Sequence, residues 1–444
     1  MNTPICDFVR GYAASGISRL HMPGHKGASV LGMEHLDITE IAGADSLYEA
    51  EGIIAESERN AGELFGAHTF YSTEGSSQCI RAMLYLALLH ARGQGITRPK
   101  IAAGRNAHKT FLSAAALLDL DVAWLYPEAD SSYLSCAVTA EDVARCIEAE
   151  HPTAVYLTGP DYLGNTVDIV AIAEVCHRHG ALLLVDNAHG AYLKFLSPSR
   201  HPMDLGADMC CDSAHKTLPV LTGGAYLHIS RSAPDLFFDM AEQALSLFAS
   251  TSPSYLILQS LDMANKYLSE DYKLRLAAAV DSVRELKRAL TESGFSLTGD
   301  EELKICIEAK KYGYFGSQMS EYLREKGIEC EFCDRDFLVM MFTPEISAEE
   351  IDFLGKTLSA LPKREAIEEK APAVGTPERV MTVREAMMSP SKEVAVRDAL
   401  GKILAAPGVS CPPAIPIVLC GELIGEREIG LFEYYGIEKC RVVR

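Results

Sequence analysis

Residues 181–190 have the sequence ALLLVDNAHG, and residues 207–216 have the sequence ADMCCDSAHK. Each is a short apolar run of strand length that ends in polar residues. Similar runs, separated by segments with helical periodicity, occupy 100–104, 122–127, 153–160 and 223–230. Apolar runs that alternate with helices are typical of a mostly parallel sheet buried on both faces. We therefore predict an α/β fold in which helices cover this sheet.

The chain around this sheet divides into three predicted segments. Residues 1–55 form a glycine-rich N-terminal arm with little periodic structure, and residues 56–290 form the large α/β domain. Residues 291–444 form one or two smaller α/β domains, with a charged, proline-containing linker near 362–380. Within the last 60 or so residues we expect a helix near 392–405.

Composition narrows the classes of function. The chain has 444 residues, of which 48% are hydrophobic and 23% charged, so it can bury a large core. Its 41 Lys and Arg against 61 Asp and Glu give a net charge of -20, which argues against nucleic-acid binding and suits a cationic small substrate. No run approaches the roughly 18 apolar residues of a membrane span. The 13 scattered cysteines favour the reducing cytoplasm.

The ends of the two quoted runs carry a lysine and a carboxylate. Lys216 follows an apolar strand, where partial desolvation would lower the pKa of its amine and favour carbonyl chemistry. A surface lysine in a polar loop is the alternative. Asp186 ends the run ALLLVD, and a carboxylate buried there needs a cationic partner such as a protonated pyridine nitrogen. A capping aspartate would leave the same pattern.

Two further segments could bind the rest of a cofactor. Gly75, Ser76 and Ser77 precede a helical stretch, where hydroxyls and backbone N–H groups can cradle a phosphate, or where serine simply caps the helix. His108 follows the run KIAAG, and its flat ring could stack on a cofactor ring or serve a structural role. Together with Asp186 and Lys216, these features form the set that a pyridoxal-phosphate (PLP) site requires.

On these motifs the sequence resembles the fold-type I PLP enzymes, and more narrowly the Orn/Lys/Arg decarboxylase family in a compact form without an N-terminal wing domain. The narrower resemblance rests on HMPGHKG at 21–27, DITEIAGADSLYEAEGII at 37–54, SAHKTLPVLT at 213–222, STSPSY at 250–255 and PPAIP at 412–416, followed by Gly421-Glu422. The sequence departs from the family pattern in TEGSSQ at 73–78, in Ala414 where glycine is usual, and in Gly401-Lys402.

The resemblance implies a role for each motif residue. Lys216 would be the Schiff-base lysine, Asp186 the partner of the pyridine nitrogen, and His108 the ring stacked on the cofactor. His189 would lie beside the cofactor near the substrate carboxylate. The residues expected around the phosphate are Gly75, Ser76, Ser77, Ser213 and His215. In a homodimer, or a higher assembly with the active site at the subunit interface, Thr251 or Ser252 would reach the phosphate of the neighbouring subunit.

The predicted reaction is PLP-dependent decarboxylation of lysine, arginine or ornithine, which releases CO2 and a polyamine-type amine. Lys216 or His215 would return a proton to Cα. The acids that could face the far end of the substrate are Glu74, Asp45, Asp161 and Asp212, so the substrate stays open.

Two other functions remain possible on the same motifs. An aminotransferase or β-lyase could use Arg384 as a carboxylate clamp, and a non-catalytic, regulatory PLP-binding protein could keep the fold. We expect no metal site, because His177 and His179 do not share a helix face and the pair Cys210-Cys211 is explained by packing.

Overall fold

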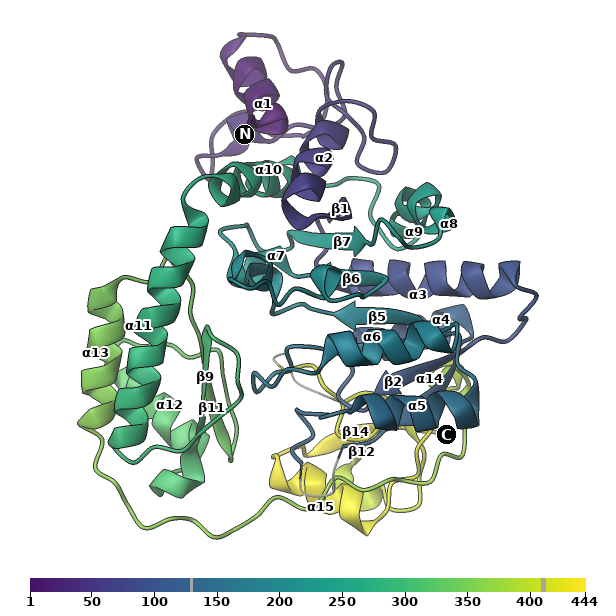
Figure 1. Cartoon of the computed structure of the whole chain (residues 1–444), viewed down its shortest axis with the longest axis vertical. Coiled ribbons are helices and arrows are strands. Elements are labelled where there is room, and N and C mark those ends of the chain that lie inside the picture. The colour runs from purple at the N-terminus through teal and green to yellow at the C-terminus, as the bar shows by residue number, and fades with distance from the viewer. Residues whose placement is uncertain (128–130, 409–412) are drawn as a thin grey trace. The chain divides into compact units, whose positions relative to one another are not determined.

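The computed structural model describes residues 1–127, 131–408 and 413–444. The chain forms two compact units, which are each discontinuous in sequence. The first unit consists of Met1–Ile96 and Leu182–Leu274, and the second of Thr97–Ala181 and Arg275–Arg444. Figure 1 labels most of the helices and many of the strands of both units.

The strands of the first unit carry both quoted runs. They are β1 (His68–Ser72), β5 (Leu182–Asp186), β6 (Met209–Asp212) and β7 (Ala225–Ile229), in the order β1-β7-β6-β5. The pair β5–β6 is parallel, and β7 is antiparallel to both β6 and β1. Every residue of β5 is buried, as its continuous apolar run predicts. Strand β1 was not predicted from the sequence.

Helices surround these strands. The helices of the first unit are α1 (Pro4–Ala14), α2 (Ile53–Phe65), α3 (Ser76–Gly93), α7 (Ala214–Thr217), α8 (Asp235–Asp239), α9 (Ala241–Ser246) and α10 (Tyr255–Ser269), with 3-10 turns at Glu34–Leu36, Ala191–Phe195 and Pro202–Asp204. Helix α3 packs against all four strands. Helix α1 corrects the expectation of an irregular arm, because Ile5, Cys6 and Val9 form a buried face and Asp262 accepts the N–H of Cys6.

The second unit holds the three remaining predicted runs. They form β2 (Lys100–Gly104), β3 (Asp121–Leu125) and β4 (Ala154–Thr158), and β2 pairs in parallel with both neighbours. The helices that follow these strands are α4 (Lys109–Leu118), α5 (Ala140–Glu150) and α6 (Ile169–Arg178). The predicted mostly parallel sheet with helices is therefore confirmed.

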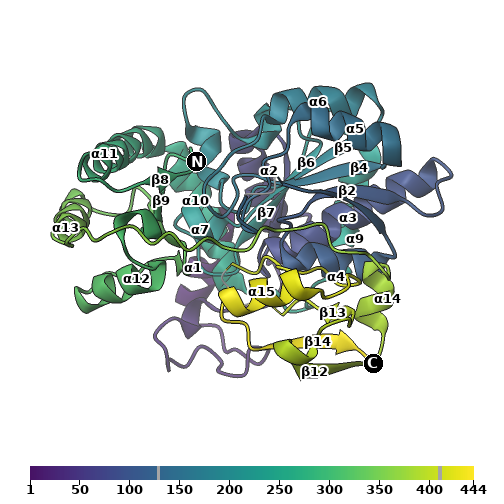
Figure 2. The same ribbon diagram turned by 90° about the horizontal axis from the view of Figure 1, so that it is seen from below.

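A small α/β module follows in the second unit. Its strands are β8 (Leu297–Thr298), β9 (Lys304–Glu308), β10 (Phe332–Cys333) and β11 (Phe337–Met341), in the order β10-β11-β9-β8. Its helices are α11 (Tyr272–Glu292), which begins in the first unit, a 3-10 turn at Ala309–Tyr312, α12 (Gly316–Glu325) and α13 (Ala348–Ser359). Figure 2 shows these helices beside β8 and β9.

The C-terminal segment forms a three-stranded sheet. The prediction of a helix near 392–405 is wrong. The segment contains α14 (Val383–Met388), β12 (Ser391–Ala395), a 3-10 turn at Val396–Asp398, β13 (Leu404–Ala406), α15 (Glu426–Tyr434) and β14 (Lys439–Val443). Both β12 and β13 pair antiparallel with β14, so pairing with a strand distant in the sequence overrides the local helical pattern.

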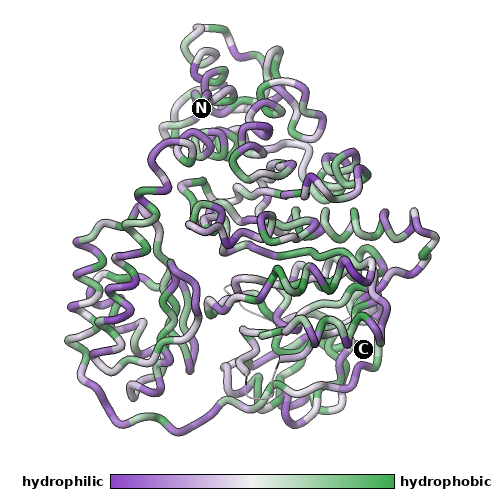
Figure 3. The backbone as a smooth tube through the Cα atoms, viewed as in Figure 1, coloured by the Kyte–Doolittle hydropathy of each residue, from purple (hydrophilic) through white to green (hydrophobic). Residues whose placement is uncertain are grey.

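The hydropathy of the residues along the helices agrees with their packing on one side. In Figure 3 the helices α11 and α13 alternate hydrophobic and hydrophilic residues along their length. This alternation is typical of helices with one buried face. Within the described residues, no helix has enough length and apolar character to span a bilayer.

Candidate active site

The lysine loop lies where strands β5 and β6 end. Strand β6 ends at Asp212, Ser213 precedes the short helix α7, and the backbone N–H of Lys216 donates to the carbonyl of Ser213. Because β5 and β6 are paired, with Asp186 opposite Cys211, their carboxyl ends lie side by side. The Lys216 Nζ accordingly lies 2.9 Å from Nε2 of His189, three residues beyond Asp186.

Asp186 is a buried carboxylate with only 2% of its surface exposed. Its Oδ1 accepts the backbone N–H of Ala188 at 3.2 Å and faces the thiol of Cys211 at 3.7 Å. Burial penalises an ionised carboxylate and strengthens its attraction for a cation at the strand end. A protonated ring nitrogen is such a cation, and the pairing of Asp186 with it stays a prediction.

Two hydroxyls meet at the start of helix α3. The Ser213 Oγ donates to the Ser76 Oγ at 2.8 Å, and Ser76 and Ser77 are the first two residues of this 18-residue helix. Gly75 precedes them with φ 73°, and its N–H donates to the carbonyl of Gly223 at 2.7 Å. A helix N-terminus with adjacent hydroxyls attracts an anion. The structure thus brings Gly75, Ser76 and Ser213 together as a candidate phosphate cradle.

His215 is half-buried beside this cradle, and its hydrogen bonds define its protonation. Its backbone N–H donates to the carbonyl of Gly224, and its ring Nδ1 lies 3.0 Å from the same oxygen. Burial, together with the charge of Lys216, lowers the pKa of His215 below its usual value. At neutral pH the ring is therefore neutral, with its one proton on Nδ1 and directed at the carbonyl.

Three other predicted residues, His108, Thr251 and Ser252, are described by their local contacts. His108 belongs to the second unit, where it caps helix α4 by accepting the N–H of Thr110 at 3.2 Å. Thr251 and Ser252 lie on an exposed loop after α9, and the backbone N–H of the preceding Ser250 donates to Glu74. The stacking role of His108 and the intersubunit role of the loop stay predictions.

The C-terminal motif PPAIP falls partly outside the described residues, because Pro412 is not among them. The rest of the motif contacts the His108 loop: the carbonyl of Ala414 accepts the N–H of Lys109, and Arg105 donates to Pro416 and Ile417. Ala414 has φ 57°, a left-handed conformation that costs an L-residue energy and that glycine adopts freely.

Most of the acids proposed to face the substrate have structural partners. Asp45 accepts the N–H groups of Gly52, Ile54 and Ala55 at the start of α2. Asp161 is buried and accepts hydrogen bonds from Asn165. Arg384, the clamp of the aminotransferase alternative, donates to the last carbonyls of α4.

Sequence reasoning missed residues whose role is defined only by the fold. Gly223 has φ 101°, and a Cβ there would lie 2.8 Å from the carbonyl oxygen of Thr73, so only glycine allows the close approach that orients Gly75. Its sequence signal was the Gly-Gly pair before β7. Asn187 and His201, which bind Asp212, gave no signal in the sequence.

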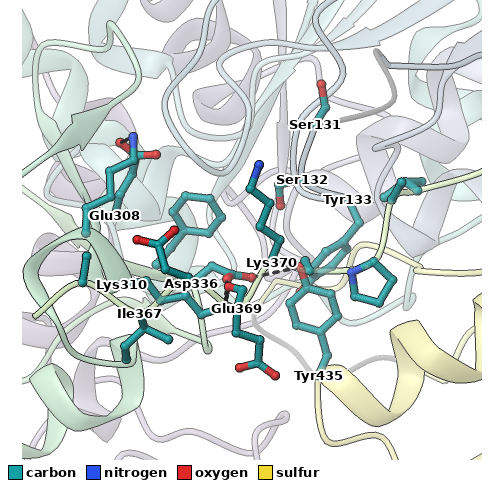
Figure 4. Close-up of a pocket in the computed structure, with 18 residues that line it drawn as sticks. Ser131, Ser132, Tyr133, Glu308, Lys310, Asp336, Ile367, Glu369, Lys370 and Tyr435 are labelled. Carbon is teal, nitrogen blue, oxygen red and sulfur yellow. Dashed lines mark hydrogen bonds and ion pairs between the residues drawn. The ribbon is translucent and has the colours of Figure 1, made fainter.

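A cavity of about 400 Å³ lies in the second unit and is lined by other residues than those predicted for the site. Figure 4 shows Tyr133 and Tyr435 on one side and Lys310 with Asp336 on the other, and Lys310 Nζ lies 2.7 Å from the Asp336 carboxylate. Glu308 and Glu369 pair with Lys311 and Arg335. Within the described part of the chain, no predicted site residue lines this cavity.

The chain is similar in sequence to a known family of enzymes. The model of the major domain of the Orn/Lys/Arg decarboxylases matches residues 3–308. The chain is 29% identical to an arginine decarboxylase of Bacillus subtilis over 461 residues, and 31% identical to one of Halalkalibacterium halodurans over 466 residues. Each alignment covers 96% of this chain and 92% of the relative.

The solved lysine decarboxylase of Francisella novicida shares the fold, with a TM-score of 0.81 at 16% identity over 100% of this chain and 81% of that one. The fold-type I architecture predicted from the motifs is therefore confirmed. The matched segment contains Gly75, His108, Asp186 and Lys216, on which the resemblance was based. The chain belongs to the Orn/Lys/Arg decarboxylase family and is, as predicted, a decarboxylase of basic amino acids.

Proposed function

We propose that this protein is a PLP-dependent decarboxylase whose substrate is arginine. The observation that carries the cofactor assignment is the 2.9 Å contact between Lys216 Nζ and His189 Nε2, at the strand end next to the buried Asp186. The choice of arginine is supported by the two arginine decarboxylases that align along 96% of the chain. The net charge of -20 favours a cationic substrate in general.

The first unit offers a complementary group for each part of PLP. The amine of Lys216 would bind the aldehyde carbon, the Asp186 carboxylate would hold the protonated pyridine nitrogen, and the phosphate would lie at the start of α3 with Ser76 and Ser213. PLP supplies an electron sink for the bond that breaks at Cα. His108 from the second unit would stack on the ring, and Ser77 would contribute to the phosphate cradle.

Proton transfer to Cα falls to Lys216 rather than to His215. The single ring proton of neutral His215 is directed at the carbonyl of Gly224, and its lowered pKa makes a second proton costly at neutral pH. Lys216 carries exchangeable protons at a flexible terminus, and His189 accepts a hydrogen bond from its ammonium form. His189 would thereby hold the amine close to the reacting carbon.

The arm supports a homodimer. Residues 17–33 expose a series of large apolar side chains, which have 60–92% of their surface accessible: Ile17, Leu20, Met22, Val30 and Leu31. Several exposed large apolar side chains in one segment are a typical feature of an interaction surface, and a second copy of the chain is the partner that we propose. Thr251 or Ser252 would then reach the phosphate of the other subunit. The described cysteines are free thiols, which supports a cytoplasmic location.

The test is a product assay on arginine, lysine and ornithine, with and without added PLP. We expect PLP-dependent release of CO2 and the corresponding amine, fastest from arginine. Lys216→Ala should abolish turnover, whereas the exposed Lys273→Ala in the same unit should not. Release of a keto acid without CO2 would indicate an aminotransferase, and bound PLP without turnover of any of the three would indicate a regulatory binding protein.

A further inference from the structure

A buried polar cluster lies directly before the lysine loop, and the proposed chemistry does not use it. Its centre is Asp212, whose Oδ2 lies 3.0 Å from Nε2 of His201 and 3.2 Å from Nε2 of His228. Its Oδ1 accepts the side-chain N–H of Asn187 at 2.6 Å. All four side chains are fully buried. Three N–H groups therefore converge on one carboxylate inside the first unit.

The alternation of strand β6 separates this cluster from the cofactor side. Cys211 directs its thiol at Asp186, so Cys210 and Asp212 point to the opposite face of the sheet. There Cys210 lies across from His228 on β7. The two buried carboxylates, Asp186 and Asp212, thus end neighbouring strands and occupy opposite faces.

The protons of this cluster can be assigned from its outer contacts. The Nδ1 of His201 accepts the backbone N–H of Met203 at 3.3 Å, so the ring proton is on Nε2 and is donated to Asp212. Burial lowers the pKa of His228, whose Nδ1 binds the hydroxyl of Thr69 at 2.8 Å. Burial alone would raise the pKa of Asp212, but the electrostatic attraction of His201 and His228, together with the hydrogen bonds from their Nε2 atoms, holds that pKa far below its usual value.

This assignment argues against a metal site. Ligand atoms of His201, Cys210 and Asp212 lie within 4.8 Å of one another. A metal ion, however, would need the lone pair of His201 Nε2, which instead carries the proton donated to Asp212. The cluster is therefore a hydrogen-bonded anchor with Asp212 as its fixed anion.

Asn187 connects this anchor to the turn that carries Asp186 and His189. Its backbone N–H donates to the carbonyl of Cys211 at 3.0 Å, and its own carbonyl accepts the N–H of Gly190 at 2.8 Å. A Cβ on Gly190 would lie 2.1 Å from Oδ1 of Asn187, so the side chain is folded closely over the turn. Displacing Asn187 would therefore shift the residues on either side of it.

We infer that Asp212 and Asn187 are positioning residues for the cofactor. The anchored anion holds Asn187, and Asn187 holds the turn from Asp186 to Gly190 in register with Lys216. The inference rests on the proposed PLP site, because it concerns how the ring nitrogen and the aldehyde are kept within reach of Asp186 and Lys216 together.

The experiment compares two buried asparagines of the first unit. Asn187→Ala removes the link, whereas Asn265→Ala removes an equally buried side chain that donates to Tyr71 and Ser57. The dissociation constant of PLP is measured by titrating each apo variant, and stability is measured by thermal unfolding of the same samples. We expect Asn187→Ala to weaken PLP binding about tenfold, equivalent to ~1.4 kcal/mol. Asn265→Ala should lower the unfolding temperature and leave the PLP dissociation constant within about twofold of wild type.

A second test exchanges the side chains of Asn187 and Asp212, which we call the reversed pair, and so does not depend on shortening a side chain to alanine. Asn187→Asp places two carboxylates against each other and should weaken PLP binding more than Asn187→Ala does. Adding Asp212→Asn restores a donor and an acceptor with their positions exchanged, and should recover PLP affinity to within about threefold of wild type.

Three results would overturn the inference. They are wild-type PLP affinity in folded Asn187→Ala, equal loss of affinity in Asn265→Ala, and no recovery in the reversed pair. Failure of the wild-type protein itself to bind PLP would instead refute the proposed function, and the positioning role with it.

Discussion

Replacement of Arg105 by Met should destabilise the second unit strongly. The guanidinium of Arg105 donates to the carbonyls of Pro416 and Ile417 at 3.0 and 2.8 Å and lies 3.3 Å from the carboxylate of Glu422. The two side chains are only 4% and 2% exposed. Breaking a buried pair on one side leaves an uncompensated charge and costs about 3–5 kcal/mol. For a unit of this size, that corresponds to a fall in unfolding temperature of roughly 6–10 °C.

The pH dependence of this loss has a defined sign. Burial raises the pKa of Glu422, and Arg105 opposes that rise, so removing Arg105 raises the pKa further. The unpaired acid is then protonated more readily, which makes the loss smaller at pH 5 than at pH 8.

The assay is thermal unfolding of Arg105→Met, Glu422→Gln and the double variant at both pH values. Because the single change leaves a buried charge and the double change does not, the double variant should be at least ~1 kcal/mol more stable than additivity predicts. Strict additivity, or a loss of stability that is independent of pH, would refute the reasoning.

Three further predictions address the acid of the small module, the phosphate cradle and the arm. Burial raises the pKa of Asp334 to about 6, so the folded state binds its proton more tightly than the unfolded state, and the stability from this group is lost as pH rises through 6. In thermal unfolding, Asp334→Asn should therefore change the free energy of unfolding little at pH 4 and raise it by up to about 3 kcal/mol at pH 8. An equal effect at both pH values would contradict this. Gly223→Ala should weaken PLP binding about tenfold in a titration of the apoprotein, because the new Cβ would lie 2.8 Å from the carbonyl oxygen of Thr73. The control is Gly95→Ala, at a glycine that also has a positive φ but open space around it, and this change should leave PLP binding unaltered. The double variant Leu20→Ser/Leu31→Ser should shift the protein toward monomer in light scattering, whereas the exposed Leu274→Ser outside the arm should leave the mass unchanged.

The strands that carry the site could be predicted because they are buried on both faces. Continuous apolar runs such as 182–186 leave little choice of structure, and the polar residues that follow them must lie at one edge of the sheet. This is why Lys216 and the turn after Asp186 could be placed together from sequence alone. Strand β1 has no such run, and its strand conformation depends on pairing with β7.

The parts that could not be predicted depend on contacts between distant residues. The strands β12 and β13 form because β14 lies between them, although the local sequence suggested a helix. The cluster around Asp212 needs Asn187 from the end of β5, His201 from a connecting turn and His228 from β7. No spacing along the chain indicates that these side chains meet.

Borohydride reduction of the PLP-loaded protein, followed by peptide mass mapping, measures directly which amine binds the cofactor. We predict a single pyridoxyl group on Lys216, and its loss in Lys216→Ala without unfolding. Labelling of another lysine, or no covalent label in a protein that holds PLP, would contradict the assignment of Lys216 and Asp186 to one cofactor.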